Sequence, residues 1–165
     1  MLNENKFCSF VDYTYTQTAL NYSHTVMMPF YESPDKSITS FVNNKEEYIL
    51  IKMEGDINEE EYKEVFMLLL DPEKTQGYNK VLFNQENIGS VSSKSRAWLV
   101  MKFMPMLQKQ LGENFEVAVV KSSTTFQRIA AQVLLKSLMA INNKFRIGYF
   151  DDRNTAKEWL AYKKK

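Results

Sequence analysis

The chain has 165 residues, of which 44% are hydrophobic and 25% charged, with 21 basic residues against 20 acidic ones. This length gives room for one domain with a substantial core, and the composition excludes disordered and fibrous classes. The net charge of +1 gives no overall field towards nucleic acid, and no apolar stretch is long enough to span a bilayer. With a single cysteine and no apparent signal sequence, we predict a cytoplasmic protein without nucleic-acid partners or a membrane span.

The first part of the chain divides into an extension and the start of a sheet. Residues 1–29 are polar and aromatic without a sustained period, so they are expected to form an N-terminal extension to a domain at 30–165. Two β-rich runs, 38–42 and 47–53, flank Asn43 and Asn44, which tolerate the positive φ of a tight turn. This pattern predicts an antiparallel hairpin.

Two helices are predicted in the middle of the chain. The first begins at the N-cap Asn58, with Glu61 three residues later, and ends near residue 70 because Pro72 follows. A strand at 80–83 and a polar loop at 84–89 lead to the second helix, which runs from Ser92 or Ser93 to residue 111. Pro105 removes one hydrogen bond of the second helix, so a kink is expected there.

The apolar residues of the second helix predict which side it buries. Its main stripe at helical spacing consists of Ala97, Trp98, Met101, Met104, Leu107 and Leu111. Phe103 and Met106 fall off this stripe. We expect these two side chains to be exposed at an interface or covered by the N-terminal extension.

The last third of the chain repeats the alternation of strand and helix. An apolar strand at 115–120 precedes a cap at 122–124 and a helix to about residue 140, and a strand at 145–150 precedes a final helix. Asp152 or Asn154 caps this last helix, and Trp159 helps to dock it. The chain is therefore predicted to be an α/β domain whose mixed sheet joins an N-terminal hairpin to parallel strands, with about four helices.

The order of elements and four segments resemble one known family. The segments are residues 55–62, 81–89, 95–98 and 150–160, of which the last is the most specific. On these the chain resembles the SpoIIAA-like family of the STAS (anti-sigma-factor antagonist) superfamily, in its divergent branch, over residues 30–160. The resemblance implies a non-enzymatic binding or regulatory module that acts through protein–protein interaction. It also implies an affinity of the fold with lipid-binding CRAL-TRIO domains.

The regulatory motif of the anti-sigma antagonists is incomplete here. In those proteins an Asp-Ser-Ser-Gly segment carries a phosphoserine, whereas residues 91–94 read Val-Ser-Ser-Lys. Ser92 and Ser93 align with the serines, but the aspartate and the glycine are absent. The resemblance therefore implies the fold and ligand binding more than a phosphorylation switch.

The sequence offers few groups for catalysis. His24 and Cys8 are the only histidine and cysteine, which argues against a nucleophilic triad and against a zinc site. The acidic residues 59–61 are explained by the positive end of a helix dipole. We therefore predict no catalytic residue, no metal and no cofactor.

The candidate ligand or partner surface lies where the parallel strands end and along the second helix. It comprises Asn84, Gln85, Asn87, Ser92, Ser93, Arg96, Trp98, Phe103, Met106, Lys121 and Ser122, and Asp151 and Arg153 lie at the same edge. Turn formation and helix capping explain the polar members equally well. Two functions stay open: a protein partner or homodimer on the second helix, and carriage of a small apolar or lipid-like ligand. A closed apolar cavity under that helix would favour the carrier.

Overall fold

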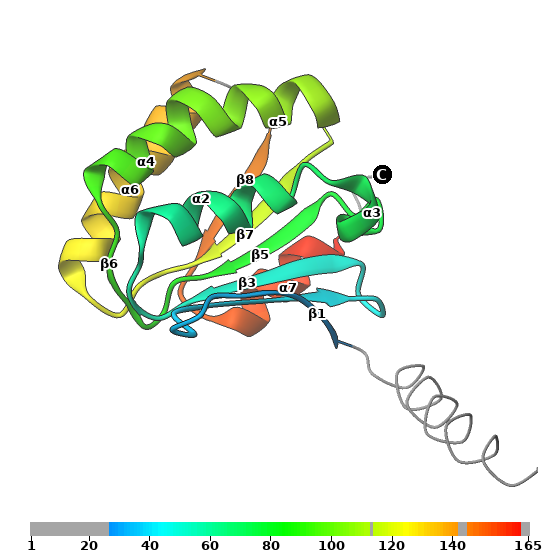
Figure 1. Ribbon diagram of the computed structural model, residues 1–165, viewed down its shortest axis with the longest axis horizontal. Helices are drawn as coiled ribbons and strands as arrows, with labels where there is room; N and C mark the ends of the chain where they lie inside the picture. Colours follow the sequence, from blue (N-terminus) through cyan, green and yellow to red (C-terminus); the bar gives the residue numbers. More distant parts are fainter. Residues whose placement is uncertain (1–26, 113, 142–144, 163–165) are drawn as a thin grey trace, which may run out of the picture.

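A computed structural model describes residues 27–112, 114–141 and 145–162. Its centre is a six-stranded mixed sheet with the order β1-β2-β3-β5-β7-β8 (Figure 1). The predicted hairpin is formed by β2 and β3, and the last three strands join β3 in parallel, as predicted. The edge strand β1, antiparallel to β2, was not predicted. The strands are β1 (Met27–Glu32), β2 (Ile38–Asn43), β3 (Tyr48–Met53), β5 (Lys80–Asn84), β7 (Glu116–Val120) and β8 (Arg146–Phe150).

The N-terminal hairpin differs from the sequence prediction in two respects. Residues 27–32, for which no strand was predicted, form the edge strand β1, so residues 27–29 belong to the sheet and not to an extension. Residues 1–26 lie outside the described part. In the turn between β2 and β3, the residue with positive φ is Glu47, at 56°, instead of Asn43 or Asn44. The Asn43 side chain instead accepts hydrogen bonds from the backbone N–H groups of Lys45 and Glu46, which closes a longer turn.

Asn58 starts helix α2 (Glu59–Leu68) as predicted, by accepting hydrogen bonds from the backbone of Glu60 and Glu61. Asp71 does more than end this helix, because it caps a short second one, α3 (Pro72–Thr75). A small parallel pair, β4 (Gly55–Asp56) and β6 (Ile88–Ser90), was not predicted. It depends on Gly89, where a Cβ atom would lie 2.7 Å from the carbonyl carbon of Gly55.

The predicted second helix is one rod with an interruption: α4 (Ser93–Trp98), the π-helical turn η1 (Leu99–Phe103) and α5 (Met104–Leu111). Pro105 has no N–H to donate to Met101, and in place of a simple kink the Met104 N–H reaches back five residues to the Leu99 carbonyl. One extra residue in a turn rotates the following side chains by about 100°. Met101, predicted to face inwards, is therefore 70% exposed.

Phe103 also differs from the expectation, because the same rotation turns its side chain into the core. It was expected at an interface or under the N-terminal extension, yet it is only 2% exposed and lies in the core. Its ring packs 5.3 Å from Phe66 and 5.9 Å from Trp98. Met106, at 42% exposed, is on the surface as expected.

The helices cover the two faces of the sheet unequally (Figure 1). The α2 helix, the α4–η1–α5 rod and α6 (Thr125–Ile141) lie over one face, and α7 (Arg153–Ala161) lies over the other. Asp152 caps α7, and Ala156 and Leu160 are buried against β5 and β7. The face under α2, the rod and α6 holds the larger core, and the candidate site lies there.

Candidate functional site

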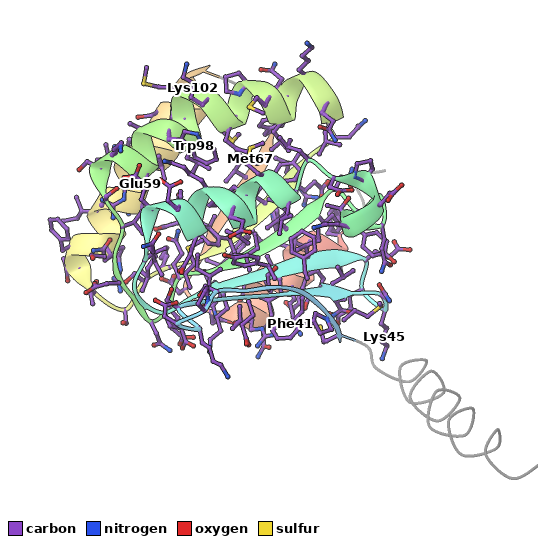
Figure 2. The ribbon with its side chains drawn as sticks, in the orientation of Figure 1. Phe41, Lys45, Glu59, Met67, Trp98 and Lys102 are labelled. Carbon is purple, nitrogen blue, oxygen red and sulfur yellow. The ribbon has the colours of Figure 1, made fainter. Side chains whose placement is uncertain are left out.

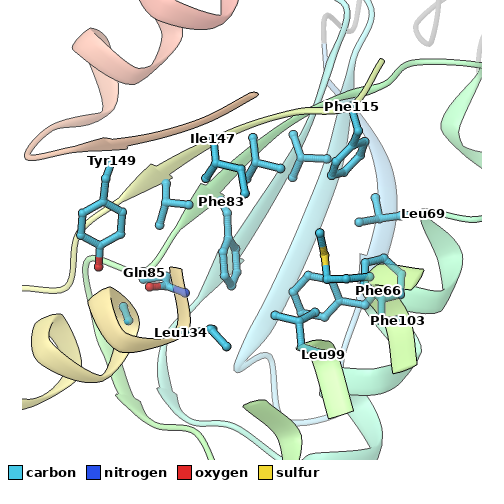
Figure 3. Close-up of a pocket in the computed structure, with 15 residues that line it drawn as sticks. Phe66, Leu69, Phe83, Gln85, Leu99, Phe103, Phe115, Leu134, Ile147 and Tyr149 are labelled. Carbon is cyan, nitrogen blue, oxygen red and sulfur yellow. The ribbon is translucent and has the colours of Figure 1, made fainter. Parts of the chain in front are cut away.

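A cavity lies between the sheet and the helices that cover the face with the larger core, namely α2, the α4–η1–α5 rod and α6 (Figure 3). We call it the chamber; its volume is ≈ 80 Å³. It lies beneath the α4–η1–α5 rod, where a closed apolar cavity was expected if the protein carries a ligand, and it is partly open. The lining residues are Phe66, Leu69, Val81, Phe83, Gln85, Leu99, Phe103, Met104, Phe115, Val117, Val119, Ala131, Leu134, Ile147 and Tyr149.

The floor of the chamber follows from the period of the strands. Side chains of a strand alternate between its two faces, so residues two apart share a face. The floor uses every second residue of three neighbouring parallel strands: 81, 83 and 85 along β5, 115, 117 and 119 along β7, and 147 and 149 along β8. The register brings these rows side by side, because Phe83 pairs with Val119 and Val119 with Tyr149.

The roof of the chamber is made of packed aromatic rings. Phe66 on α2 contacts Phe83 on the floor, at 5.7 Å between ring centroids, and Phe103 on η1, at 5.3 Å. Trp98, labelled in Figure 2, stacks on Phe103 with 5.9 Å between ring centroids. Aromatic pairs at these distances hold each other in place. The α2 side of the chamber is therefore held in place by ring contacts. Trp98 does not line the chamber, but its fluorescence should respond to movement of the chamber residue Phe103.

Gln85 and Tyr149 are the polar side chains of the lining, and Figure 3 shows them at the same end of the chamber. The Tyr149 hydroxyl is buried and has no hydrogen-bond partner among the described residues. Burial raises the pKa of Tyr149 above its ordinary value, against a smaller opposing effect of Arg128. The hydroxyl is therefore neutral at physiological pH and can both donate and accept a hydrogen bond.

A second, smaller hollow of ≈ 20 Å³ adjoins this polar end and shares Gln85, Ala131 and Leu134 with the chamber. Arg96 donates a hydrogen bond of 2.6 Å to the Gln127 side chain at its wall. Burial raises the pKa of Tyr62, another wall residue, well above its usual range. The hollow is thus lined partly by neutral or paired polar groups.

Outside the chamber, an open groove of ≈ 450 Å³ runs between the α4–η1 rod and α6. Ala97, Val100 and Met101 line it from the rod, and Ala130 and Val133 line it from α6. Leu134 borders the groove, the small hollow and the chamber. This side chain therefore lies between the interior hollows and the surface groove.

The structure brings only some of the predicted site residues to these hollows. Gln85 and Phe103 line the chamber, Arg96 lines the small hollow and the groove, and Ser93 lines the groove. Trp98 lies one ring behind the chamber, and Met106 lies on the surface of α5.

The remaining predicted site residues have local structural roles. Asn84 accepts a hydrogen bond from the Glu86 backbone, and Asn87 donates one to Glu54. Ser92 caps α4, and Ser122 accepts from the Thr124 backbone in the turn before α6. Lys121 forms a salt bridge of 2.8 Å with the exposed Asp151.

The chamber combines an apolar lining with the two polar side chains Gln85 and Tyr149. The described residues contain no group of three or more His, Cys, Asp or Glu side chains that could hold a metal ion. The helices of the described part include none with the length and hydropathy to cross a membrane. An apolar lining with a few polar groups is typical of small-molecule sites.

One family model matches more than half of the chain. The SpoIIAA-like family model matches residues 48–161. A crystal structure of an uncharacterised DUF3478-family protein with a SpoIIAA-like fold, from Shewanella loihica PV-4, is 20% identical to this chain. The comparison covers 81% of this chain and 91% of that chain, with a TM-score of 0.45. No protein of curated function matches.

Proposed function

We propose that this chain, which belongs to the SpoIIAA-like family, is a binding module that holds a small amphiphile in the chamber, its apolar part inside and its polar end at Tyr149. The fold of this family suggests a regulatory or binding module in general. The observation that carries the narrower proposal is the chamber itself, an apolar cavity with an unpartnered hydroxyl at one end.

The apolar lining determines how strongly the binding free energy should depend on the length of the ligand's hydrocarbon chain. Each methylene group moved from water into such a site contributes about 0.8 kcal/mol, which is roughly a fourfold gain in affinity. Two neighbours, Tyr149 and Gln85, can satisfy one hydroxyl or carbonyl group. A hydrocarbon chain with one uncharged hydrogen-bonding end is therefore the ligand class that fits.

The size of the chamber limits what fits without movement. A cavity of about 150 Å³ holds benzene, so ≈ 80 Å³ has room for about three carbon atoms by proportion. A longer chain requires the roof to move. The α6 helix is the part of the roof best able to do so, because no aromatic pair between described residues ties it to the sheet or to another helix, whereas such pairs hold α2 to η1 and to β5.

The rival proposal, a protein partner or homodimer on the second helix, has lost part of its basis. It was motivated by Trp98, Phe103 and Met106 as exposed apolar residues. Phe103 is buried and Trp98 stacks on it, so of these three residues Met106 alone is largely exposed. Met101 on the same rod is exposed as well, but the interface would lack the aromatic anchor Phe103.

Fluorescence of Trp98 provides the test. The chain has two tryptophans, and Trp159→Phe removes the one on the α7 side of the sheet. Titration with butanol, pentanol and hexanol should then shift the Trp98 emission, because Trp98 stacks on the chamber residue Phe103. Affinity should rise with each added methylene, but by less than fourfold, because these alcohols exceed the room for about three carbon atoms and the roof has to move to admit them.

A matched pair of variants distinguishes binding in the chamber from binding in the surface groove. Ala131 lines the chamber and its neighbour Ala130 lines the groove. Ala131→Leu should abolish the titration and Ala130→Leu should preserve it. An identical response in both variants, or no dependence on chain length, would contradict the proposal.

A further inference from the structure

A second pocket lies on the other face of the sheet, between α7 and the turn that joins β2 to β3. We call it the α7 pocket; its volume is ≈ 450 Å³, and it is open to the surface. Its lining residues on the helix at positions 154, 157, 158 and 161 are spaced i, i+3, i+4 and i+7, so they share one side of α7. The complete lining is Glu46, Tyr48, Asn154, Lys157, Glu158, Leu160 and Ala161.

Tyr48 is the buried polar residue of this lining. It is the first residue of β3, is 2% exposed and belongs to the smaller core together with Leu160. Its hydroxyl has no hydrogen-bond partner among the described residues. A buried hydroxyl without a partner is destabilising, and folded proteins satisfy the large majority of such groups. Because Tyr48 lines the α7 pocket, a molecule bound there can provide the missing partner.

The lining of the α7 pocket contains charges of both signs. Lys157 forms a salt bridge of 3.7 Å with Glu46, which also accepts a hydrogen bond of 2.9 Å from the Asn43 side chain. An ammonium group has three donors, so Lys157 retains donors for a second anion. Glu158 is exposed and forms no salt bridge with another described residue. The pocket therefore offers a cation and a carboxylate side by side on one helix.

We propose that the α7 pocket binds a small zwitterion of the α-amino acid class. The ligand carboxylate accepts hydrogen bonds from Lys157 and from the Tyr48 hydroxyl, and the ligand ammonium group donates to Glu158. A ligand with one charge uses only one of the two charged side chains, whereas a zwitterion uses both. The chamber lies on the opposite face of the sheet, so this site is independent of the proposed function.

Three compounds with the same carbon skeleton test the charge pattern. At about pH 6, below the ordinary pKa of an α-amino group, leucine is a zwitterion, leucine methyl ester a cation and N-acetylleucine an anion. In an NMR titration of the full chain, leucine should shift the methyl signals of Leu160 and Ala161, which line the pocket. Leucine should bind about fivefold more tightly than either derivative, because each derivative loses one charged contact.

Neutral variants of the two charged residues distinguish the two ends of the ligand. Lys157→Gln should weaken the binding of leucine and of N-acetylleucine about fivefold and leave that of the methyl ester unchanged. Glu158→Gln should weaken the binding of leucine and of the methyl ester and leave that of N-acetylleucine unchanged. The control is Glu86→Gln, an exposed carboxylate after β5 and thus at the opposite end of the parallel strands from Tyr48. It should bind all three compounds like the unchanged protein.

Tyr48→Phe tests the buried hydroxyl. It should weaken the binding of leucine about fivefold, through the lost hydrogen bond, without lowering the midpoint of thermal unfolding, because the hydroxyl has no partner to lose in the free protein. A lower midpoint would show that the hydroxyl is already satisfied there and would overturn the proposal, as would unchanged binding of leucine by this variant.

Two results of the titration itself would also overturn the proposal. One is equal affinity for the three compounds, and the other is unshifted Leu160 and Ala161 signals at a large excess of leucine. The methyl signals of Val117 and Val119, which line the chamber, should stay unchanged in this titration. The alkanol titration follows the chamber, so the two sites can fail separately.

Discussion

Filling the chamber by Ala131→Leu should stabilise the protein while it abolishes ligand binding. Ala131 contributes only a methyl group to the chamber wall on α6. Leucine adds three carbon atoms, which matches the room that the chamber has by comparison with a benzene-sized cavity. The perturbation thus fills the space that we assign to the ligand.

The expected gain follows from the number of added carbons. At about 0.8 kcal/mol for each buried methylene, three carbons raise the free energy of unfolding by at most about 2.4 kcal/mol. Ordering of the new side chain reduces this by about 0.5–1 kcal/mol. A net gain of about 1–2 kcal/mol is therefore expected. Natural proteins commonly sacrifice stability of this size at sites that bind.

Urea denaturation of both variants measures the effect. Ala131→Leu should raise the denaturation midpoint with an unchanged m-value, while Ala130→Leu, which faces the groove, should stay within about 0.5 kcal/mol of the unchanged protein. A clear destabilisation by Ala131→Leu would show that the space is filled in solution. Stabilisation without any loss of alkanol binding would show that the chamber is a packing defect and not the ligand site.

Three further predictions concern the fold around the site. Phe103→Ala should lower the free energy of unfolding by about 3–5 kcal/mol in urea denaturation, because a buried ring is lost, whereas a value near zero would contradict its placement in the core. Ser92→Ala should cost about 1 kcal/mol in the same assay, through the lost cap of α4, and Ser92→Asp should restore most of it. Hydrogen bonds from Thr155 lower the pKa of Asp152, so its contribution to stability is complete above the ordinary aspartate pKa of about 4 and is lost as the pH falls through the lowered value. Thermal melts on acidification should show a smaller loss for Asp152→Asn than for the unchanged protein, and equal losses would contradict this role.

The central hairpin, the parallel strands and the longer helices could be predicted because their local capping signals agree with the pattern of apolar residues. Asn58, Ser92 and Asp152 cap the helices they were expected to cap, and Gly112 ends the α4–η1–α5 rod with a φ of 61°. The strands after residue 80 read as apolar runs, and they are parallel in the sheet. Such signals act within a few residues, so one sequence contains them completely.

The chamber was predictable only in part. The alternation of 81, 83 and 85, and of 115, 117 and 119, is visible in the sequence and predicts one shared face. What one sequence does not reveal is that packed helices leave space above this face. The error at Phe103 has a local cause, because a period of 3.6 residues was assumed across a π-helical turn. The unusual signal there was Pro105, which was interpreted as a kink.

Nuclear Overhauser contacts between hexanol and the methyl groups of the protein test the central claim most directly. If the chamber holds the ligand, the alkyl protons should contact the methyl groups of Val117, Val119 and Ile147, which line the chamber floor. Contacts confined to Ile129 and Val133 on the surface of α6, or no contacts at saturating hexanol, would contradict a ligand site inside the protein.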